Sequence, residues 1–182
     1  MRYLEVRRHS KRSRPNQHLN QWGVALARGL GTQLGPFDRV VTSPLPRCVE
    51  TAVAMGFAVD ETIDQLAGKD RLGESFPAME QVDWSIGCAV FQPLIAADEA
   101  LAAFVATQAE VWRSVVEQLP KGGQALLIGH GGAFLDGTAV YCLPEFDHAT
   151  WGAVSRYCEG IRLHFDGERF SGAEILKVKQ VT

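Results

Sequence analysis

The sequence predicts an α/β sandwich, in which helices cover a mainly parallel sheet. Two observations support this fold class. Short strand-like segments alternate along the chain with segments whose apolar residues recur every three or four positions, as they do on one face of a helix. In addition, residues 125–128 are apolar at every position, which is typical of a strand buried on both sides in a parallel sheet.

The length and composition predict a single domain over residues 1–182. The 182 residues are 46% hydrophobic and 21% charged, an ordinary balance for globular domains, which usually have roughly 100–200 residues. The chain has no apolar run near the ~20 residues of a membrane helix, and its N-terminus lacks the apolar stretch of a signal peptide. Its four cysteines include no CxxC pair. We therefore expect thiols in a reducing cytoplasm, and no membrane partner.

The first strand and helix are predicted before residue 31. Residues 3–6 alternate apolar and polar side chains, which is the pattern of a short strand. A basic loop follows over residues 8–17. Apolar residues then recur at spacings of three and four from Leu19 to Leu30, which predicts a helix that ends in the glycines around and after Leu30.

The second strand is predicted at residues 39–42, and another helix follows it directly. Ser43 and Pro44 are expected to begin this helix as its N-cap and its first residue. The helix is expected to run to about Met55, because the glycine at position 56 favours a helix end.

The middle of the chain, residues 60–93, is the least regular segment. Its acidic residues, glycines and prolines predict a long excursion with short helical pieces, and loops of this length in a compact domain are usually functional. A clear amphipathic helix follows over residues 98–119, with Asp98 favouring its start and Pro120 ending it.

The last part of the chain is expected to complete the sheet. The elements predicted after Pro120 are the apolar strand 125–128, a glycine-rich turn at 129–132, a helix over 133–143, and closing strands at 153–165 and 173–178 around a turn at Asp166.

Three of the predicted strands are followed by residues that can bind an anion. Arg8 and His9 follow the first strand, Arg47 lies shortly after the second, and His130 follows the apolar strand 125–128. The carboxyl ends of parallel strands share one edge of a sheet, where ligands bind. We therefore expect two arginines and two histidines in one crevice.

Two arginines and two histidines suit a phosphoryl group. Guanidinium groups match phosphate oxygens bidentately, and an unprotonated imidazole is a competent nucleophile at phosphorus. Because these charged groups can stabilise the transferring group, the hypothesis requires neither a metal nor another cofactor.

The charge distribution favours a local anion site. Residues 1–15 contain six basic residues and one acidic residue, whereas the whole chain has a net charge of −3. A nucleic-acid-binding protein would normally be basic over a whole face, so we do not expect a nucleic-acid partner.

Three motifs, in order along the chain, resemble those of the histidine phosphatase superfamily, the phosphoglycerate mutase-like proteins. Arg8-His9-Ser10 resembles the Arg-His-Gly signature. VVTSPLPRCVETA at 40–52 is similar to the Ser-Pro-x-x-Arg-x-x-x-Thr-Ala segment, and LLIGHGG at 126–132 to the second-histidine segment. The segment 19–31 resembles the first helix of the family. The resemblance implies a three-layer α/β/α sandwich with a mainly parallel central sheet.

The resemblance also implies roles for individual residues. His9 would be the nucleophile that becomes phosphohistidine, Arg8 and Arg47 would hold the phosphate, and His130 would stabilise the transferring phosphoryl group. Arg12 resembles the additional phosphate-binding arginine of the acid phosphatase branch.

The sequence departs from the family pattern at several positions. Ser10 replaces the usual glycine, and Pro15 stands where the mutase-like branch usually has an asparagine. The Leu-x-Glu segment that supplies an acid in that branch is absent, because Gly68 occupies the glutamate position. Glu74 is the expected substitute as proton donor, with Asp70 and Glu80 as the alternatives.

The leading hypothesis is a phosphatase that acts through phosphohistidine on a phosphorylated small molecule or a phosphoprotein. One alternative is phosphoryl transfer of the phosphoglycerate mutase type. Another is a catalytically silent phosphate-binding module, which Ser10 and the missing acid motivate. A third is a metal hydrolase that uses His9, His130 and Asp136, although nearby arginines would repel a cation.

Overall fold

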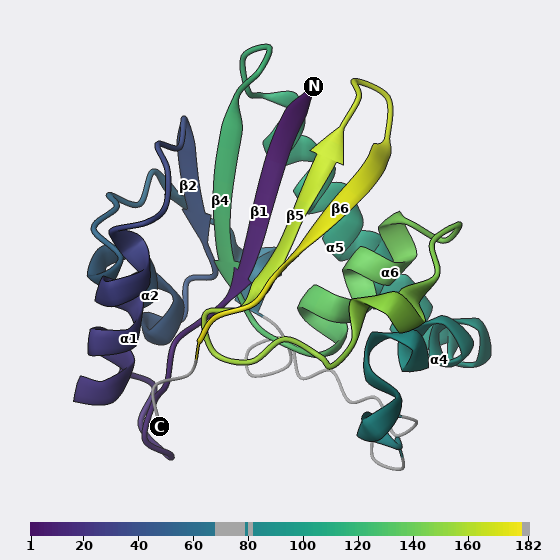
Figure 1. The fold of residues 1–182 in the computed structure, drawn as a ribbon, viewed down its shortest axis with the longest axis horizontal. Coiled ribbons are helices and arrows are strands. Elements are labelled where there is room, and N and C mark those ends of the chain that lie inside the picture. Colours follow the sequence, from purple (N-terminus) through teal and green to yellow (C-terminus); the bar gives the residue numbers. More distant parts are fainter. Residues whose placement is uncertain (68–78, 80–81, 180–182) are drawn as a thin grey trace.

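A six-stranded sheet forms the middle layer of the computed structural model, which describes residues 1–67, 79 and 82–179 (Figure 1). The strand order is β3-β2-β4-β1-β5-β6. In chain order the strands are β1 (Arg2–Arg8), β2 (Arg39–Thr42), β3 (Glu61–Thr62), β4 (Gln124–Gly129), β5 (Gly160–Phe165) and β6 (Phe170–Leu176).

The first four strands in the chain are parallel, and the last two are not. β2 pairs in parallel with both β3 and β4, and β1 pairs in parallel with β4. The hairpin of β5 and β6 extends the sheet, with β5 antiparallel to β1. The predicted α/β class with a mainly parallel sheet is therefore confirmed, with an antiparallel hairpin at one edge.

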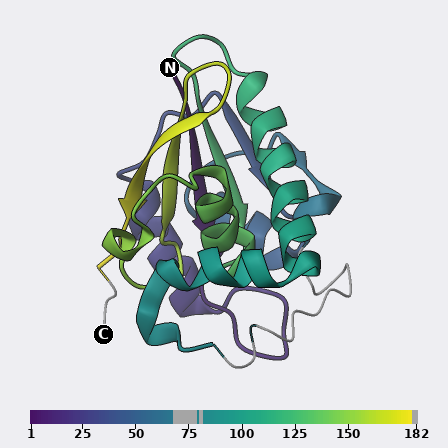
Figure 2. The same ribbon diagram turned by 90° about the vertical axis from the view of Figure 1, so that its right-hand side faces the viewer.

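Helices cover the two faces of the sheet, as Figures 1 and 2 show. α1 (Gln21–Gly31) and α2 (Pro46–Ala54) pack on one face, where a small apolar core forms. α4 (Phe91–Ala97), α5 (Glu99–Glu117) and α6 (Thr138–Cys142) lie on the other face, over a larger core. The three layers expected from the family resemblance are therefore present.

β4 supplies apolar side chains to both cores. Leu126 and Ile128 belong to the core under α1 and α2, whereas Ala125 and Leu127 belong to the core under α5. All four side chains are fully buried, which explains why this strand is apolar at every position.

β1 carries charged residues on the face that it shares with Leu126. Glu5 and Arg7 are almost fully buried there, at 1% and 4% exposure, and Arg7 Nε donates to Glu5 Oε1 at 2.5 Å. Arg162 Nη2 donates to the other oxygen of Glu5 at 2.8 Å, and Arg7 Nη1 donates to the Cys158 carbonyl at 2.7 Å. Both carboxylate oxygens of Glu5 are thus paired, as a buried charge requires.

The prediction for the start of α2 was two residues too early. Leu45, not Ser43, is the N-cap residue, and Pro46 is the first residue of the helix. A residue before proline is kept out of the helical region, so Leu45 stays extended. The Ser43 amide instead donates to the Ile128 carbonyl at 3.0 Å and continues the ladder between β2 and β4.

The prediction for the first closing strand was also too early. Residues 153–159 form a loop, and β5 begins at Gly160. Cys158 has φ 61°, in the left-handed region that interrupts an extended strand. The predicted turn at Asp166 is confirmed, because its side chain accepts the amides of Glu168 and Arg169.

The described parts of the excursion contain short elements, as predicted. β3 is followed by the 3₁₀ helix Asp64–Ala67, and the 3₁₀ helix Trp84–Val90 leads into α4. Among the described residues, no single helix has the length and apolarity of a membrane span. Trp84–Ala97 and Glu99–Glu117 meet that test only together, across a bend of 113°.

Candidate active site

The two candidate histidines are neighbours because β1 and β4 are parallel and adjacent. Arg8, the last residue of β1, pairs with Gly129, the last residue of β4. The His9 amide then donates to the Gly129 carbonyl at 2.8 Å, and His130 follows Gly129. As a result, the ring centroids of His9 and His130 lie 5.6 Å apart, with an interplanar angle of 69°.

His9 is held as a neutral imidazole with a defined tautomer. Its Nδ1 lies 2.7 Å from the Ser10 carbonyl oxygen, which can only accept, so Nδ1 carries the hydrogen and Nε2 keeps its lone pair. The pKa of His9 is lowered to about 3, mainly by burial and also by coulombic interaction with His130, Arg47 and Arg8, whereas the Ser10 bond opposes the shift.

We expect His9 to remain unprotonated in an NMR titration of ¹⁵N-labelled histidine between about pH 8 and pH 4. An ordinary histidine has a pKa of 6.5, against about 3 for folded His9. The unfolded chain therefore binds more protons between these values. The stability that neutral His9 contributes is present above about pH 6.5 and is lost as the pH falls toward 3. A protonation midpoint for His9 near 6.5 would contradict this expectation.

The Arg8 side chain is constrained on three sides. Its Nη1 donates to the Ser155 carbonyl at 3.0 Å, and its guanidinium carbon lies 4.7 Å from the centre of the Tyr157 ring. A Cβ atom at Gly131 would lie 2.8 Å from Arg8 Cδ, so only glycine fits there without moving Arg8. Arg8 Nε is buried and has no hydrogen-bond partner within the described part of the chain, which leaves a donor for an anion.

Arg47 and His130 form a second group at the same edge. Arg47 is 4% exposed, and its Nη2 lies 3.3 Å from His130 Nδ1. Because a guanidinium can only donate, His130 Nδ1 is the acceptor and Nε2 carries the hydrogen. That Nε2 lies 3.1 Å from Ser43 Oγ, which places Ser43 in the site.

Sequence reasoning missed several residues that contact these four. Gln17 Oε1 accepts from Arg47 Nη1, so the basic loop enters the site through an amide side chain. Its position close behind Pro15, where an asparagine was expected, is the signal that could have identified it. Ser155 and Tyr157 come from the loop before β5, and no local pattern marks them.

Arg12 is not brought into contact with the other candidates in the described structure. Its Nη1 donates to the Asn16 carbonyl at 2.9 Å, and its backbone bridges to Leu19. Phosphate binding by Arg12 stays a prediction. The three candidate proton donors, Glu74, Asp70 and Glu80, lie outside the described residues.

Ser10, which replaces the usual glycine, is accommodated by hydrogen bonds. It is fully buried, its Oγ donates to the Gly23 carbonyl at 2.7 Å, and its amide donates to Thr51 Oγ1 at 2.9 Å. The extra side chain thus ties the residue after His9 to α1, while its amide is tied to α2.

The trio of His9, His130 and Asp136 does not form a metal-binding group. Within residues 1–67, 79 and 82–179, no three His, Cys, Asp or Glu side chains gather closely enough to hold a metal ion. Asp136 instead accepts hydrogen bonds from Gly132 and Ser155.

A sequence model of the family described as histidine phosphatase superfamily (branch 1) matches residues 5–174. The chain belongs to the histidine phosphatase superfamily. The match spans all three motifs that carry the resemblance, which is therefore confirmed. A comparison with curated proteins gave no match.

Solved structures place this histidine phosphatase superfamily member among phosphoglycerate mutase-like folds. A phosphoserine phosphatase from Entamoeba histolytica, in complex with 3-phosphoglyceric acid, is 16% identical, with 98% of each chain covered and a TM-score of 0.68. A phosphoglycerate mutase from Bacillus anthracis is 17% identical, with 96% of this chain and 92% of that chain covered and a TM-score of 0.63. A mycobacterial glucosyl-3-phosphoglycerate phosphatase is 16% identical, with 97% and 98% covered and a TM-score of 0.56. At such identities the likeness shows the fold alone.

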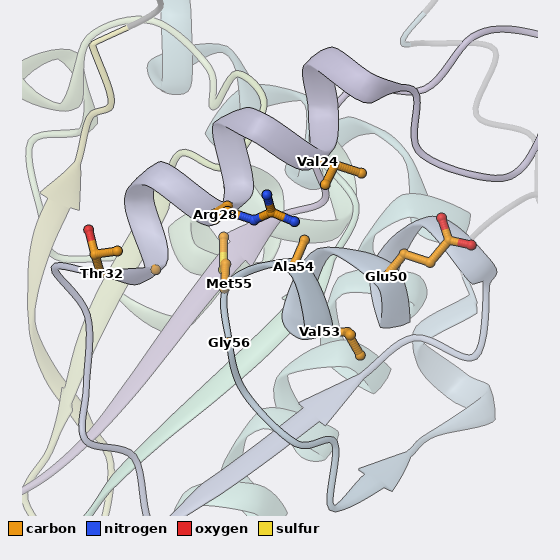
Figure 3. A pocket seen from close by; sticks show the side chains of 9 residues that line it. Val24, Arg28, Thr32, Glu50, Val53, Ala54, Met55 and Gly56 are labelled. Carbon is orange, nitrogen blue, oxygen red and sulfur yellow. The ribbon is translucent and has the colours of Figure 1, made fainter.

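A separate groove of about 570 Å³ lies between α1 and α2 (Figure 3). Val24 and Arg28 line it from α1, and Glu50 and Val53 line it from α2. None of the four candidate site residues lines this groove, so it is distinct from the histidine site.

Proposed function

We propose that this protein is a metal-independent phosphatase that hydrolyses a phosphomonoester or a phosphohistidine through a covalent phosphohistidine at His9. The observation that carries the proposal is the state of His9. It is buried, neutral and fixed through Nδ1, beside two arginines and a second histidine. Membership of the histidine phosphatase superfamily supports phosphatase or phosphoryl-transfer chemistry.

In the proposed first step, His9 Nε2 attacks phosphorus while the bond from phosphorus to the leaving group breaks. Arg8 and Arg47 bind the phosphoryl oxygens, and His130 stabilises the charge on the transferring group. The leaving group takes a proton from a carboxylic acid, for which we propose Glu74, outside the described residues. Water then attacks phosphorus, the bond to His9 breaks, and the carboxylate accepts the proton of the water.

Hydrolysis is proposed in preference to mutase chemistry. A mutase must keep water away from its phosphoenzyme until the second transfer, whereas hydrolysis has no such requirement. The proteins of similar fold include both phosphatases and a mutase, so phosphoglycerate mutase-like transfer is the second candidate.

The proposal predicts a phosphoenzyme with the chemistry of phosphohistidine. After rapid quenching of a reaction with labelled p-nitrophenyl phosphate, the protein should carry a label that is lost in acid and kept in base. The label should appear before inorganic phosphate and should be unaffected by EDTA. A panel of phosphorylated compounds, including a phosphohistidine peptide, then ranks substrates by kcat/KM. Turnover without a labelled intermediate would contradict the mechanism, and phosphate binding without turnover would favour the silent module.

A further inference from the structure

A buried carboxylate, Asp136, joins the two loops that flank the Arg8 side chain. Asp136 is fully buried at the start of the helical segment after His130. Its Oδ2 accepts the Gly132 amide at 3.0 Å. Its Oδ1 accepts both the amide of Ser155 at 3.0 Å and the Ser155 hydroxyl at 2.8 Å. One side chain thus holds the turn after β4 to the loop before β5.

Each of these loops touches Arg8. The backbone at Gly131 lies so close to Arg8 Cδ that an added Cβ would be 2.8 Å away. The Ser155 carbonyl accepts the hydrogen bond of Arg8 Nη1 at 3.0 Å. Together the loops fix the stem and one end of the guanidinium, and they leave buried Nε as a donor.

The chemistry of Asp136 differs from that of a core residue. Its neighbours Phe134 and Leu135 are buried apolar residues, and an apolar side chain would avoid the cost of burying a carboxylate. Burial raises the pKa of Asp136, whereas the hydrogen bonds from Ser155 and Gly132 lower it. Keeping a carboxylate at this buried position therefore costs folding free energy. In return, one oxygen accepts a hydrogen bond from the turn after β4 and the other accepts hydrogen bonds from the loop before β5.

We propose that Asp136 is a positioning residue that aims the Arg8 guanidinium at the bound phosphoryl group. The inference rests on the proposed function only in that Arg8 binds phosphate. Asp136 acts through the Gly131–Gly132 turn and through Ser155, and it does not touch the substrate. These four residues and Arg8 form one unit, in which loss of the carboxylate releases the arginine.

The substitution Asp136→Asn keeps the shape and removes one acceptor. If the amide oxygen still accepts from Ser155, the amide nitrogen faces the Gly132 amide, donor against donor. Leaving one buried donor unpaired weakens the hold on Arg8. We therefore expect the dissociation constant for inorganic phosphate to rise about tenfold.

A double-mutant cycle separates positioning from a merely structural role. Inorganic phosphate is titrated into wild type, Asp136→Asn, Arg8→Ala and the double variant, by calorimetry or, for weak binding, by phosphorus NMR. If Asp136 acts through Arg8, Asp136→Asn has no further effect once Arg8 is removed. Equal effects of Asp136→Asn with and without Arg8 would overturn the proposal.

Two further variants complete the design. Asp38→Asn is the matched control, because Asp38 Oδ2 accepts the Gln124 amide at 2.8 Å at the other end of β4. It should leave phosphate affinity unchanged. If Asp136→Asn does not fold, Ser155→Ala replaces it in the cycle, since it removes only the hydroxyl bond to Asp136.

Phosphate binding as the readout keeps the two proposals apart. If the wild type binds phosphate but turns over no substrate, the proposed function is contradicted. The double-mutant cycle would still test whether Asp136 acts through Arg8. Independent effects in the cycle, with a labelled phosphoenzyme in wild type, would overturn only the role of Asp136. A wild type that does not bind phosphate would overturn both.

Discussion

His9→Ala is expected to abolish the labelled phosphoenzyme and to lower turnover by at least ~10⁴-fold, as loss of a nucleophile does. The neighbouring imidazole is not placed to replace it. His130 accepts from Arg47 at Nδ1 and contacts Ser43 at Nε2, so neither nitrogen is held ready for attack. The measurement is rapid-quench labelling together with steady-state kinetics.

Two comparisons make the result specific to His9. His164→Ala removes another imidazole, one that is bonded to Glu174 on the β5–β6 hairpin, and it should leave the kinetics unchanged. Phosphate binding should survive in His9→Ala, because Arg8 and Arg47 remain. Turnover retained in His9→Ala would overturn the mechanism.

Arg47→Lys is expected to lower kcat/KM by about 10²-fold, or about 2.7 kcal/mol, comparable to the loss of a strong transition-state donor. The substitution keeps the charge and loses the planar fork. In the structure one arm of the fork bonds Gln17 and the other bonds His130. A lysine ammonium is a single point of charge and cannot hold this geometry.

Arg169→Lys is the control for the loss of a guanidinium. Arg169 is exposed in the turn between β5 and β6, where its backbone amide bonds Asp166. Steady-state kinetics of both variants against p-nitrophenyl phosphate provide the comparison. Similar kcat/KM values for Arg47→Lys and Arg169→Lys would show that Arg47 does not bind the substrate phosphate.

The sequence was sufficient to predict that Arg8, His9 and His130 lie together. Arg8 ends β1, and His9 and His130 directly follow β1 and β4. Because these two strands are parallel neighbours, residues at their carboxyl ends lie at one edge of the sheet, however far apart they are along the chain. The apolar strand 125–128 was equally predictable, because burial on both faces leaves no polar position. These features depend on pattern and on the geometry of a sheet.

Other features depend on contacts that no local pattern encodes. Gln17 and Ser155 lie in loops that are far in sequence from the site arginines that they contact. Gln17 bonds Arg47, and Ser155 bonds Arg8 and Asp136. The metal-hydrolase alternative placed Asp136 beside His9 and His130, whereas in the structure Asp136 accepts the amides of Gly132 and Ser155.

The position of β1 between β4 and β5 has a consequence for synthesis of the protein. β1, which ends at Arg8 just before His9, leaves the ribosome long before its partners, since Arg8 pairs with Gly129 and its amide donates to the Glu159 carbonyl. Both edges of the nascent strand stay unpaired until the last third of the chain emerges. Pairing over such separations is slow, and unpaired strand edges can pair with other chains. The charges of Glu5 and Arg7, which form an ion pair in the finished sheet, oppose that association while the chain is being made.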